Sequence, residues 1–391
     1  MADRDVSIVG LGMTRFGKFI DTPLRALGGE AIDAALADAG LKKSDVDMAF
    51  VANSMASVVT GEVSVVGQNI LRAREFSGIP VFNVDNACAS SSSAIALAAN
   101  AIAAGSAEVV LVLGVEKLYS ADRTRAYVAL NGAADLEFLQ ESKIDPGKES
   151  IFVTKIYPPR LKAYADAYGL RAETLAEIAV KNRKHASLNP LAQFTNQITV
   201  ADVLASRQIV GPITAMMCAP ISDGAAAVVV MRSDRAPQKE RAVRILASAV
   251  GMGASPGDRS SIRRVADKAY KQAGIVPSDV GAAEVHDSIA FNELLAYEEL
   301  GFCEPGGGTE FAESGATALG GALPVNPSGG LESRGHPVAA TGVAQLIELS
   351  IQLRGEAGKR QVPNLRYALA ENAGGFARDD TAAIVVTILG H

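Results

Sequence analysis

Cys88 is the first residue whose type and position could carry chemistry. A short buried strand is predicted over residues 79–84, and an Ala- and Leu-rich helix is predicted after the turn that follows. Asn86 and a run of serines in that turn are typical of a strand-to-helix junction with helix-capping side chains. A thiol there faces unpaired N–H groups and the positive end of the helix dipole, and both favour the thiolate. Cys88 is therefore a candidate nucleophile for carbonyl and thioester carbons; a small residue that fills a crowded turn is the alternative.

Two of the four histidines lie in turn-like settings of the second half. His286 ends a predicted strand, and open α/β sheets place their ligand sites at that carboxyl edge. His336 follows Gly335 and precedes a predicted helix over residues 343–353, so its turn is the second-half counterpart of the Cys88 turn. Each histidine alone is more often structural. Together with a cysteine at a matching edge, they indicate a catalytic group.

A glycine-rich stretch, residues 371–376, lies between two predicted strands near the C-terminus. Glycine there allows backbone N–H groups to approach a ligand oxygen closely, as an oxyanion site requires. Gly374 and Gly375 are the candidates, and an ordinary hairpin turn is the alternative.

The elements that position these residues alternate between strand and helix, which predicts a mainly parallel sheet covered on both faces. The predicted strands of the first part are 6–10, 46–51 and 108–114, and its helices are 24–39 and 63–74.

The sequence also contains an internal repeat. Residues 35–51 can be laid over residues 269–285 without a gap, and Ala, Ala, Gly, Ser, Asp, Val, Ala and Val coincide. Self-similarity at one fixed offset predicts a duplicated domain rather than a solenoid.

Residues 116–215 interrupt the pattern, with predicted helices over 161–168 and 172–185. Between positions 155 and 207, eight Lys/Arg face four Asp/Glu, an excess that could hold an anionic ligand such as a nucleotide phosphate; a solvated helical surface is the alternative. The predicted division is 1–115 with 216–240 as the first half, 116–215 as an insert, and 241–391 as the second half.

Composition excludes several functional classes. The 391 residues are 48% hydrophobic with 37 glycines and no Trp, which suits a closely packed α/β protein of two domains. The net charge of −6 without a basic tract predicts neither a nucleic-acid partner nor an anionic membrane. Three cysteines without metal-type spacing predict no metal site and fit a reducing cytosol. With no signal region and no membrane-length apolar run, a cytoplasmic protein is expected.

The stretches that contain Cys88, His286, His336 and the glycines near the C-terminus together resemble the thiolase family, most nearly its sterol-carrier-protein-type and archaeal-type members. The resemblance runs along nearly the whole chain. It is carried by a nucleophile turn, two strand-end signatures, a histidine box and a histidine loop, at residues 86–90, 114–117, 218–224, 286–293 and 335–337.

The resemblance implies two βαβαβαββ halves in a five-layer α/β/α/β/α sandwich that forms dimers or tetramers. It implies that His336 deprotonates Cys88, that the thiolate forms an acyl-enzyme from an acyl-CoA, and that His286 holds the thioester oxygen of a second substrate. The N–H groups of Cys88 and Gly374 would bind the oxyanion. The inserted domain would bind CoA, which is a substrate, and no permanent cofactor is implied. Substrate or CoA contacts fall on Ser288, Asn292, Asn326 and Gly375.

The sequence departs from the family at the second catalytic cysteine. Ser288 and Asn372 stand at the two positions where thiolases carry it, and Ala339 replaces a glycine of the histidine loop. A serine hydroxyl is a poor proton shuttle near neutral pH. Three hypotheses follow: an acyl-CoA C-acyltransferase that makes or cleaves a carbon–carbon bond of a 3-oxoacyl-CoA, an acyltransferase or retro-aldolase that needs an OB-fold/zinc-ribbon partner, and a non-catalytic CoA-binding subunit.

Overall fold

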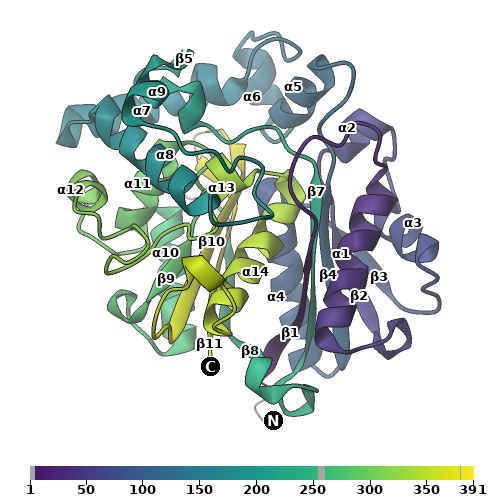
Figure 1. Cartoon of the computed structure of the whole chain (residues 1–391). Helices are drawn as coiled ribbons and strands as arrows, with labels where there is room; N and C mark the ends of the chain where they lie inside the picture. The colour runs from purple at the N-terminus through teal and green to yellow at the C-terminus, as the bar shows by residue number, and fades with distance from the viewer. Residues whose placement is uncertain (1–4, 254–259, 379) are drawn as a thin grey trace.

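The computed structural model describes residues 5–253, 260–378 and 380–391, and a nine-stranded sheet runs through its centre (Figure 1). The strand order is β3-β2-β4-β7-β1-β8-β11-β10-β9. The first half contributes β1 (Val6–Met13), β2 (Met48–Ala52), β3 (Val81–Val84), β4 (Val109–Glu116) and β7 (Gly224–Arg232). The second half contributes β8 (Val243–Gly251), β9 (Ala282–Glu284), β10 (Tyr367–Ala377) and β11 (Asp380–Gly390).

The two halves of the sheet have the same pairing pattern. In the first, β4 pairs in parallel with β2 and antiparallel with β7, and in the second, β10 pairs in parallel with β9 and antiparallel with β11. The halves meet where β1 pairs with β8, through Ser7 opposite Arg244 and Ile8 opposite Val243.

The internal repeat of the sequence is confirmed. Helix α1 (Leu24–Ala39) and helix α10 (Ser261–Ala273) each end at a glycine in the left-handed conformation, Gly40 at φ 68° and Gly274 at φ 69°. Each is followed by a short 3-10 helix, Lys43–Asp45 or Pro277–Asp279, and then by β2 or β9. Only glycine adopts that φ without strain, so the shared glycine fixes the same chain reversal twice.

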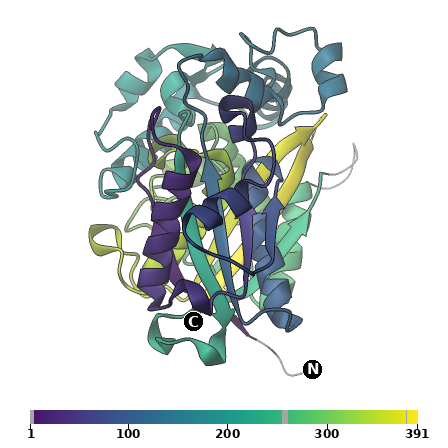
Figure 2. The ribbon, with the colours of Figure 1, turned by 90° about the vertical axis from the view of Figure 1, so that its right-hand side faces the viewer.

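Helices form three layers around the two sheet halves. Helix α1 and α3 (Val66–Ala73) cover the outer face of the first half, which Figure 2 views with α1 in front of the strands. Helices α4 (Ser90–Ala103) and α14 (Thr341–Leu353) contact each other and strands of both halves.

On the outer face of the second half lie α10 and α11 (Ala290–Glu299), which complete the five-layer order expected of the thiolase-like fold. Strand alternation explains the layers, because Val110 and Val112 of β4 pack toward the central helices while Leu111 and Leu113 pack toward α1.

The inserted region lies at one end of the sheet in both views (Figure 1, Figure 2). Its buried side chains join the core of the second half instead of forming a separate core. A π-helix, Phe152–Ile156, runs directly into α7, whose Pro158 and Pro159 lack the N–H groups that a regular helix would use there. The helices are α5 (Thr124–Asn131), α6 (Leu136–Glu141), α7 (Tyr157–Tyr168), α8 (Ala172–Ala186) and α9 (Val200–Ala205), and the strands are β5 (Gln208–Val210) and β6 (Ile213–Thr214).

Three predictions were wrong. The sheet is mixed and not mainly parallel: β2–β3, β2–β4 and β9–β10 pair in parallel, whereas the five other pairs are antiparallel. Strands such as β10 and β11 follow each other too closely in the sequence for the crossover that a parallel pair needs. The strand before Cys88 is not buried: β3 is an edge strand that pairs only with β2, and Phe82 is 49% exposed. The glycine stretch 371–376 is not a loop, because β10 continues through it and pairs Gly374 with Ala383 of β11. Among the described residues, no helix is both long and apolar enough to cross a membrane.

Candidate active site

Cys88 lies in a 3-10 turn, Ala87–Ala89, between β3 and α4. The turn places Ala87 at φ 50°, a conformation that is unfavourable for alanine, and serine side chains hold it in place. The Asn86 N–H donates to Ser90 Oγ at 2.9 Å, and Ser90 Oγ donates to the Ala87 carbonyl at 2.6 Å. The serines that follow the cysteine in the sequence therefore fasten the turn that presents it.

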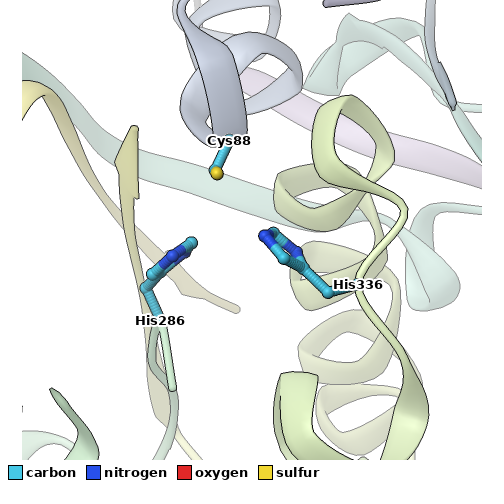
Figure 3. A group of neighbouring side chains, drawn as sticks. All are labelled: Cys88, His286 and His336. Atoms are coloured by element: carbon cyan, nitrogen blue, oxygen red, sulfur yellow. The ribbon is translucent and has the colours of Figure 1, made fainter. Parts of the chain in front are cut away.

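The side chains of Cys88, His286 and His336 converge from opposite halves of the molecule (Figure 3). One ring nitrogen of each histidine and the Cys88 sulfur all lie within 4.8 Å of one another. The two rings stand edge to face, with centroids 5.3 Å apart and an interplanar angle of 84°. Separations of this size are typical of an unliganded catalytic group, whose hydrogen bonds tighten when substrate binds.

Hydrogen bonds orient the His336 ring. Its backbone N–H donates to Ser222 Oγ at 2.9 Å, and its Nδ1 lies 2.7 Å from Thr341 Oγ1. Because the Thr341 hydroxyl donates to the Pro337 carbonyl at 3.3 Å, it accepts from Nδ1–H. This tautomer leaves the Nε2 lone pair free to accept a proton.

His286 is anchored through its backbone instead. Its N–H donates to Glu371 Oε2 at 2.9 Å, and its Nδ1 is buried without a hydrogen-bond partner among the described residues. The ring that faces Cys88 is therefore free to bond a ligand.

Burial dominates the electrostatics of the three groups. It raises the pKa of the Cys88 thiol to about 12, against the opposing effect of the N–H groups of Gly375 and Cys88 itself. It lowers the pKa of His286 to about 4, and burial together with His286 and Arg334 lowers the pKa of His336 well below its usual range. The helix end was expected to favour the thiolate, but burial outweighs that effect even though Cys88 borders a cavity. The resting site holds a neutral thiol and two neutral imidazoles.

The three residues border a cavity of about 220 Å³. Four further predicted residues, Ser288, Asn292, Gly374 and Gly375, also line it.

The structure does not bring Asn326 to the cavity. Its side chain is fully buried, accepts from the Val285 N–H at 2.9 Å and donates to Glu293 at 2.8 Å. These bonds use its amide to fix the end of β9 below His286, which is the physical reason that it cannot contact substrate directly.

Gly374 and Gly375 act on the Cys88 turn in different ways. A Cβ atom on Gly374 would lie 2.2 Å from the Asn86 carbonyl oxygen and 2.6 Å from the Ala89 nitrogen, so only glycine permits the contact. Gly375 adopts φ 63°, and it is the Gly375 N–H that stabilises the Cys88 thiolate. The predicted oxyanion role of Gly374 stays a prediction.

Sequence inspection missed several cavity residues. The Tyr157 hydroxyl lies 3.1 Å from Ser288 Oγ, which also accepts from Asn292 Nδ2 at 2.8 Å. The π-helix and the double proline beside Tyr157 are the local signal that could have marked it. The further lining residues that were not predicted include Arg160, Cys218, Glu299 and Glu371.

The basic excess of the insert is partly structural. Lys181 forms a buried ion pair with Glu293, and Arg183 donates to Ser333 at 3.0 Å and stacks over Phe194. These two charges are unavailable to a phosphate, whereas Lys155 and Arg207 are exposed.

Cys88, His286 and His336 are also the group of described side chains closest to a metal-binding geometry. Sequence spacing could not show this, because the ligands come from distant turns. The expected absence of a metal stays a prediction.

The duplicated fold and a cysteine–histidine–histidine site between its two halves define a thiolase-type protein. Two family models match the chain: "Thiolase, N-terminal domain" over residues 6–209 and "Thiolase C-terminal domain-like" over residues 248–387. The chain therefore belongs to the thiolase family and is an enzyme of the acyltransferase class that this family defines.

Named relatives agree over nearly the whole chain. Acetyl-CoA acetyltransferase of Methanothermobacter thermautotrophicus is 37% identical over 389 residues, covering 97% of this chain and 98% of the relative. Sterol carrier protein 2 of Homo sapiens is 36% identical over 413 residues, covering 98% of this chain and 72% of the relative.

Solved structures include the Ltp2-ChsH2(DUF35) aldolase, with a TM-score of 0.78, 29% identity, and coverage of 100% of this chain and 98% of that chain. Human mitochondrial 3-ketoacyl-CoA thiolase in complex with CoA has a TM-score of 0.73 at 18% identity, covering 99% and 98%, which shows the shared fold.

Proposed function

We propose that this protein is an acyl-CoA C-acyltransferase that forms an acyl-enzyme on Cys88 and makes or cleaves a carbon–carbon bond of a 3-oxoacyl-CoA. The observation that carries the proposal is the convergence of the Cys88 sulfur and one nitrogen each of His286 and His336 on one cavity. CoA enters as a substrate and not as a resident cofactor.

In the first step, Nε2 of His336 takes the Cys88 proton and the sulfur attacks the thioester or 3-oxo carbonyl carbon. Negative charge develops on the carbonyl oxygen, and the N–H groups of Cys88 and of Gly374 or Gly375 stabilise it. The effect of the Gly375 and Cys88 N–H groups on the Cys88 thiolate supports this role. Burial disfavours both the thiolate of Cys88 and the imidazolium of His336. Proton transfer between the two residues is therefore expected to follow substrate binding. The leaving group, CoA thiolate or an enolate, receives the proton from His336.

In the second step, His286 binds the thioester oxygen of the other acyl-CoA while its enolate forms. The unpartnered ring of His286 supports this role, since it has hydrogen-bonding capacity to spare. His336, neutral again after the first step, takes the α-proton as the enolate forms. The enolate carbon attacks the acyl-enzyme carbonyl, the bond to the Cys88 sulfur breaks, and His336 returns the proton so that Cys88 leaves as a thiol.

A second candidate is supported by the site where thiolases carry another cysteine. Ser288 bonds to Tyr157 and Asn292 there, so the cavity offers hydroxyl groups at this position and not a thiol. The Ltp2-ChsH2(DUF35) aldolase, which resembles this chain along its full length, is named as a two-component assembly. Retro-aldol cleavage or acyl transfer with an OB-fold/zinc-ribbon partner is therefore the alternative activity.

Association with a second copy is also proposed. The edge strand β3 exposes its unpaired side, and Phe82, Val63 and Val65 on and before it are 49%, 80% and 52% exposed. Unpaired, apolar sheet edges favour pairing with another chain, which supports a homodimer or a dimer of dimers. A reducing cytoplasmic compartment remains part of the proposal, supported by three free cysteines.

Incubation with acetyl-CoA followed by intact-protein and peptide mass spectrometry tests the main proposal. An acetyl group on Cys88 that free CoA removes is the expected result, and Cys88→Ala should remain unmodified. A Ser288→Cys variant should raise thiolysis of a 3-oxoacyl-CoA if the missing thiol limits it.

An adduct that only a partner protein releases would favour the second candidate. The absence of any adduct with acetyl-CoA and with longer acyl-CoAs would instead indicate a CoA-binding subunit without catalysis.

A further inference from the structure

The cavity continues from the catalytic group along one face of α11. Asn292, Ala296 and Glu299 all line it, and helical periodicity places residues three, four and seven positions apart on the same face. Asn292 bonds Ser288 beside the catalytic histidines. Glu299 lies two turns further on, about 10 Å along the helix axis at 1.5 Å per residue. The cavity therefore has a catalytic end and a far end marked by Glu299.

Side chains of helix α7 reach the α11 segment at two points. Tyr157 contacts Ser288, just before α11, at 3.1 Å, and Tyr164 donates to Glu298, near the end of α11, at 2.6 Å. Arg160 lies one turn beyond Tyr157 and also lines the cavity. Its guanidinium stands over the Phe376 ring, 5.4 Å from the ring centroid.

Arg160 and Glu299 leave polar capacity unused in this cavity. Arg160 makes no hydrogen bond or ion pair with any described residue, and Glu299 accepts only from Ser260, at 2.8 Å. The two side chains are close enough for Arg160 to oppose the effect of burial, which raises the pKa of Glu299, yet they do not form an ion pair. A donor and an acceptor thus border the same cavity, and described residues leave part of the hydrogen-bonding capacity of each unused.

The walls between the two ends are apolar. Phe152, Ile262, Leu295 and Phe376 line this part of the cavity, so a ligand that reaches the far end must be largely hydrocarbon. An unsubstituted alkyl end would displace water from Arg160 and Glu299 without replacing its hydrogen bonds, which is costly. A carboxylate would meet Arg160 but also Glu299 and the neighbouring Glu371. An ammonium group would be repelled by Arg160.

We propose that the cavity selects acyl-CoA substrates whose acyl group carries a hydroxyl group at its far end. The hydroxyl oxygen accepts from Arg160 and its proton is donated to Glu299, a pairing that one hydroxyl can satisfy by itself. The hydrocarbon between thioester and hydroxyl lies against Leu295 and Phe376. This assignment rests on the proposed acyl-enzyme function and names the class of acyl group that Cys88 receives.

The test measures the rate of Cys88 acylation by mass spectrometry with three CoA thioesters of eight acyl carbons: octanoyl, omega-hydroxyoctanoyl and omega-carboxyheptanoyl. The hydroxy compound is expected to react about tenfold faster than the other two at subsaturating concentration, because one charge-assisted hydrogen bond accounts for such a factor. Only one chain length of omega-hydroxyacyl-CoA brings the hydroxyl group to both Arg160 and Glu299. The preference should therefore peak at that length and fall for shorter and longer chains.

Arg160→Met and Glu299→Leu should each bring the ratio of the omega-hydroxyoctanoyl rate to the octanoyl rate close to one, whatever their effect on the octanoyl rate itself. Lys162→Met is the matched control, since Lys162 lies on the same helix with its side chain 74% exposed and paired with Asp166. Equal rates for the hydroxy and unsubstituted compounds, or a preference that survives both substitutions, would overturn this inference and leave the acyl-enzyme intact. No adduct from any thioester would overturn the proposed function and the inference together.

Discussion

The Cys88 turn and the His336 turn are built alike, and each rests on a strand of the opposite half. Both are 3-10 turns, Ala87–Ala89 and Val338–Ala340, that lead directly into the central helices α4 and α14. Gly374 of second-half β10 lies under the Cys88 turn, and Gly114 of first-half β4 lies under the His336 turn. A Cβ on Gly114 would come within 2.7 Å of the Ala339 carbonyl oxygen, so both contacts need glycine. The duplication therefore brings nucleophile and base together by reciprocal packing.

The two contacts differ in the polar groups that they offer. Beyond Gly114, the β4 strand ends in Glu116, whose carboxylate accepts the Ala339 N–H at 3.2 Å and the Ala56 N–H at 2.7 Å. Beyond Gly374, β10 offers the Gly375 N–H to Cys88. The first-half strand thus holds a turn with an acceptor, while the second-half strand places a donor where negative charge develops. The two contacts therefore share a backbone arrangement but differ in electrostatic character, since one offers an acceptor and the other a donor.

The largest effect is expected from placing alanine under the Cys88 turn. Gly374→Ala forces the Asn86 carbonyl away and shifts Cys88, and displacements near 1 Å can lower catalytic rates about a hundredfold. The rate of Cys88 acetylation measures the loss. Gly147→Ala is the matched control, because a Cβ there meets nothing closer than 3.5 Å. Acetylation at the native rate in Gly374→Ala would show that the reciprocal contact does not position the nucleophile.

Substituting the two histidines separates the steps that they serve. His336→Asn should slow acetylation of Cys88 by about 10²–10⁴-fold, the usual contribution of a general base. His286→Asn should acetylate within a few-fold of the native rate but lose carbon–carbon bond cleavage, measured as CoA-dependent loss of a 3-oxoacyl-CoA. His391→Asn serves as the control, since that ring bonds only the Leu353 carbonyl outside the cavity. Equal acylation defects in both site variants would contradict the division of roles.

The pH dependence of thiol reactivity tests whether the donors on β10 outweigh burial. Burial raises the pKa of Cys88 to about 12, so the thiolate fraction should climb continuously from pH 7 to pH 10. Alkylation by iodoacetamide, followed by mass spectrometry, should therefore accelerate throughout this range. A plateau beginning below pH 7 would indicate a stable thiolate–imidazolium pair and contradict the neutral resting site.

Much of the site could be read from sequence because its central residues occupy recognisable turns. Cys88, His286 and His336 each follow a strand and precede helical residues, and the His336 turn could be recognised as the second-half counterpart of the Cys88 turn. The acidity of the thiol could not be read in this way, because desolvation depends on atoms from both halves, whereas the helix-end effect is local. The edge position of β3 was hidden for a similar reason, since apolar composition does not show how many neighbours a strand has.

The far end of the cavity was also beyond sequence reasoning. Arg160 and Glu299 are separated by more than a hundred positions, and only the tertiary fold brings both to the wall of one cavity. Asn326 is the opposite case, a residue that sequence reasoning places at the site and the structure does not. A substrate or CoA contact is predicted there, yet its amide hydrogen-bonds the Val285 N–H and the Glu293 side chain.

The smallest effect is expected in the free energy of unfolding, from Glu116, which is the acceptor under the His336 turn. Burial raises the pKa of Glu116 to about 7, against hydrogen bonds from Met55, Ala339 and Ala56, and the unfolded-state value is near 4.5. The folded protein therefore retains a proton that the unfolded chain loses, so this contribution to stability is present below pH 4.5 and is lost as the pH rises through 7. Burial also raises the pKa of Glu284 and Glu371, so the native protein and Glu116→Gln should both lose stability between pH 5 and pH 8. Urea unfolding should show a loss that is about 2 kcal/mol larger in the native protein than in Glu116→Gln.

The Glu116→Gln variant itself should be about 1–2 kcal/mol less stable at pH 5, because an amide cannot accept at both positions. The same pH slope in both proteins would show that Glu116 is ionised in the fold at pH 8 and compensated by its N–H donors. In that event the first-half contact would resemble the second in stabilising negative charge, and the electrostatic contrast between the two turns would disappear.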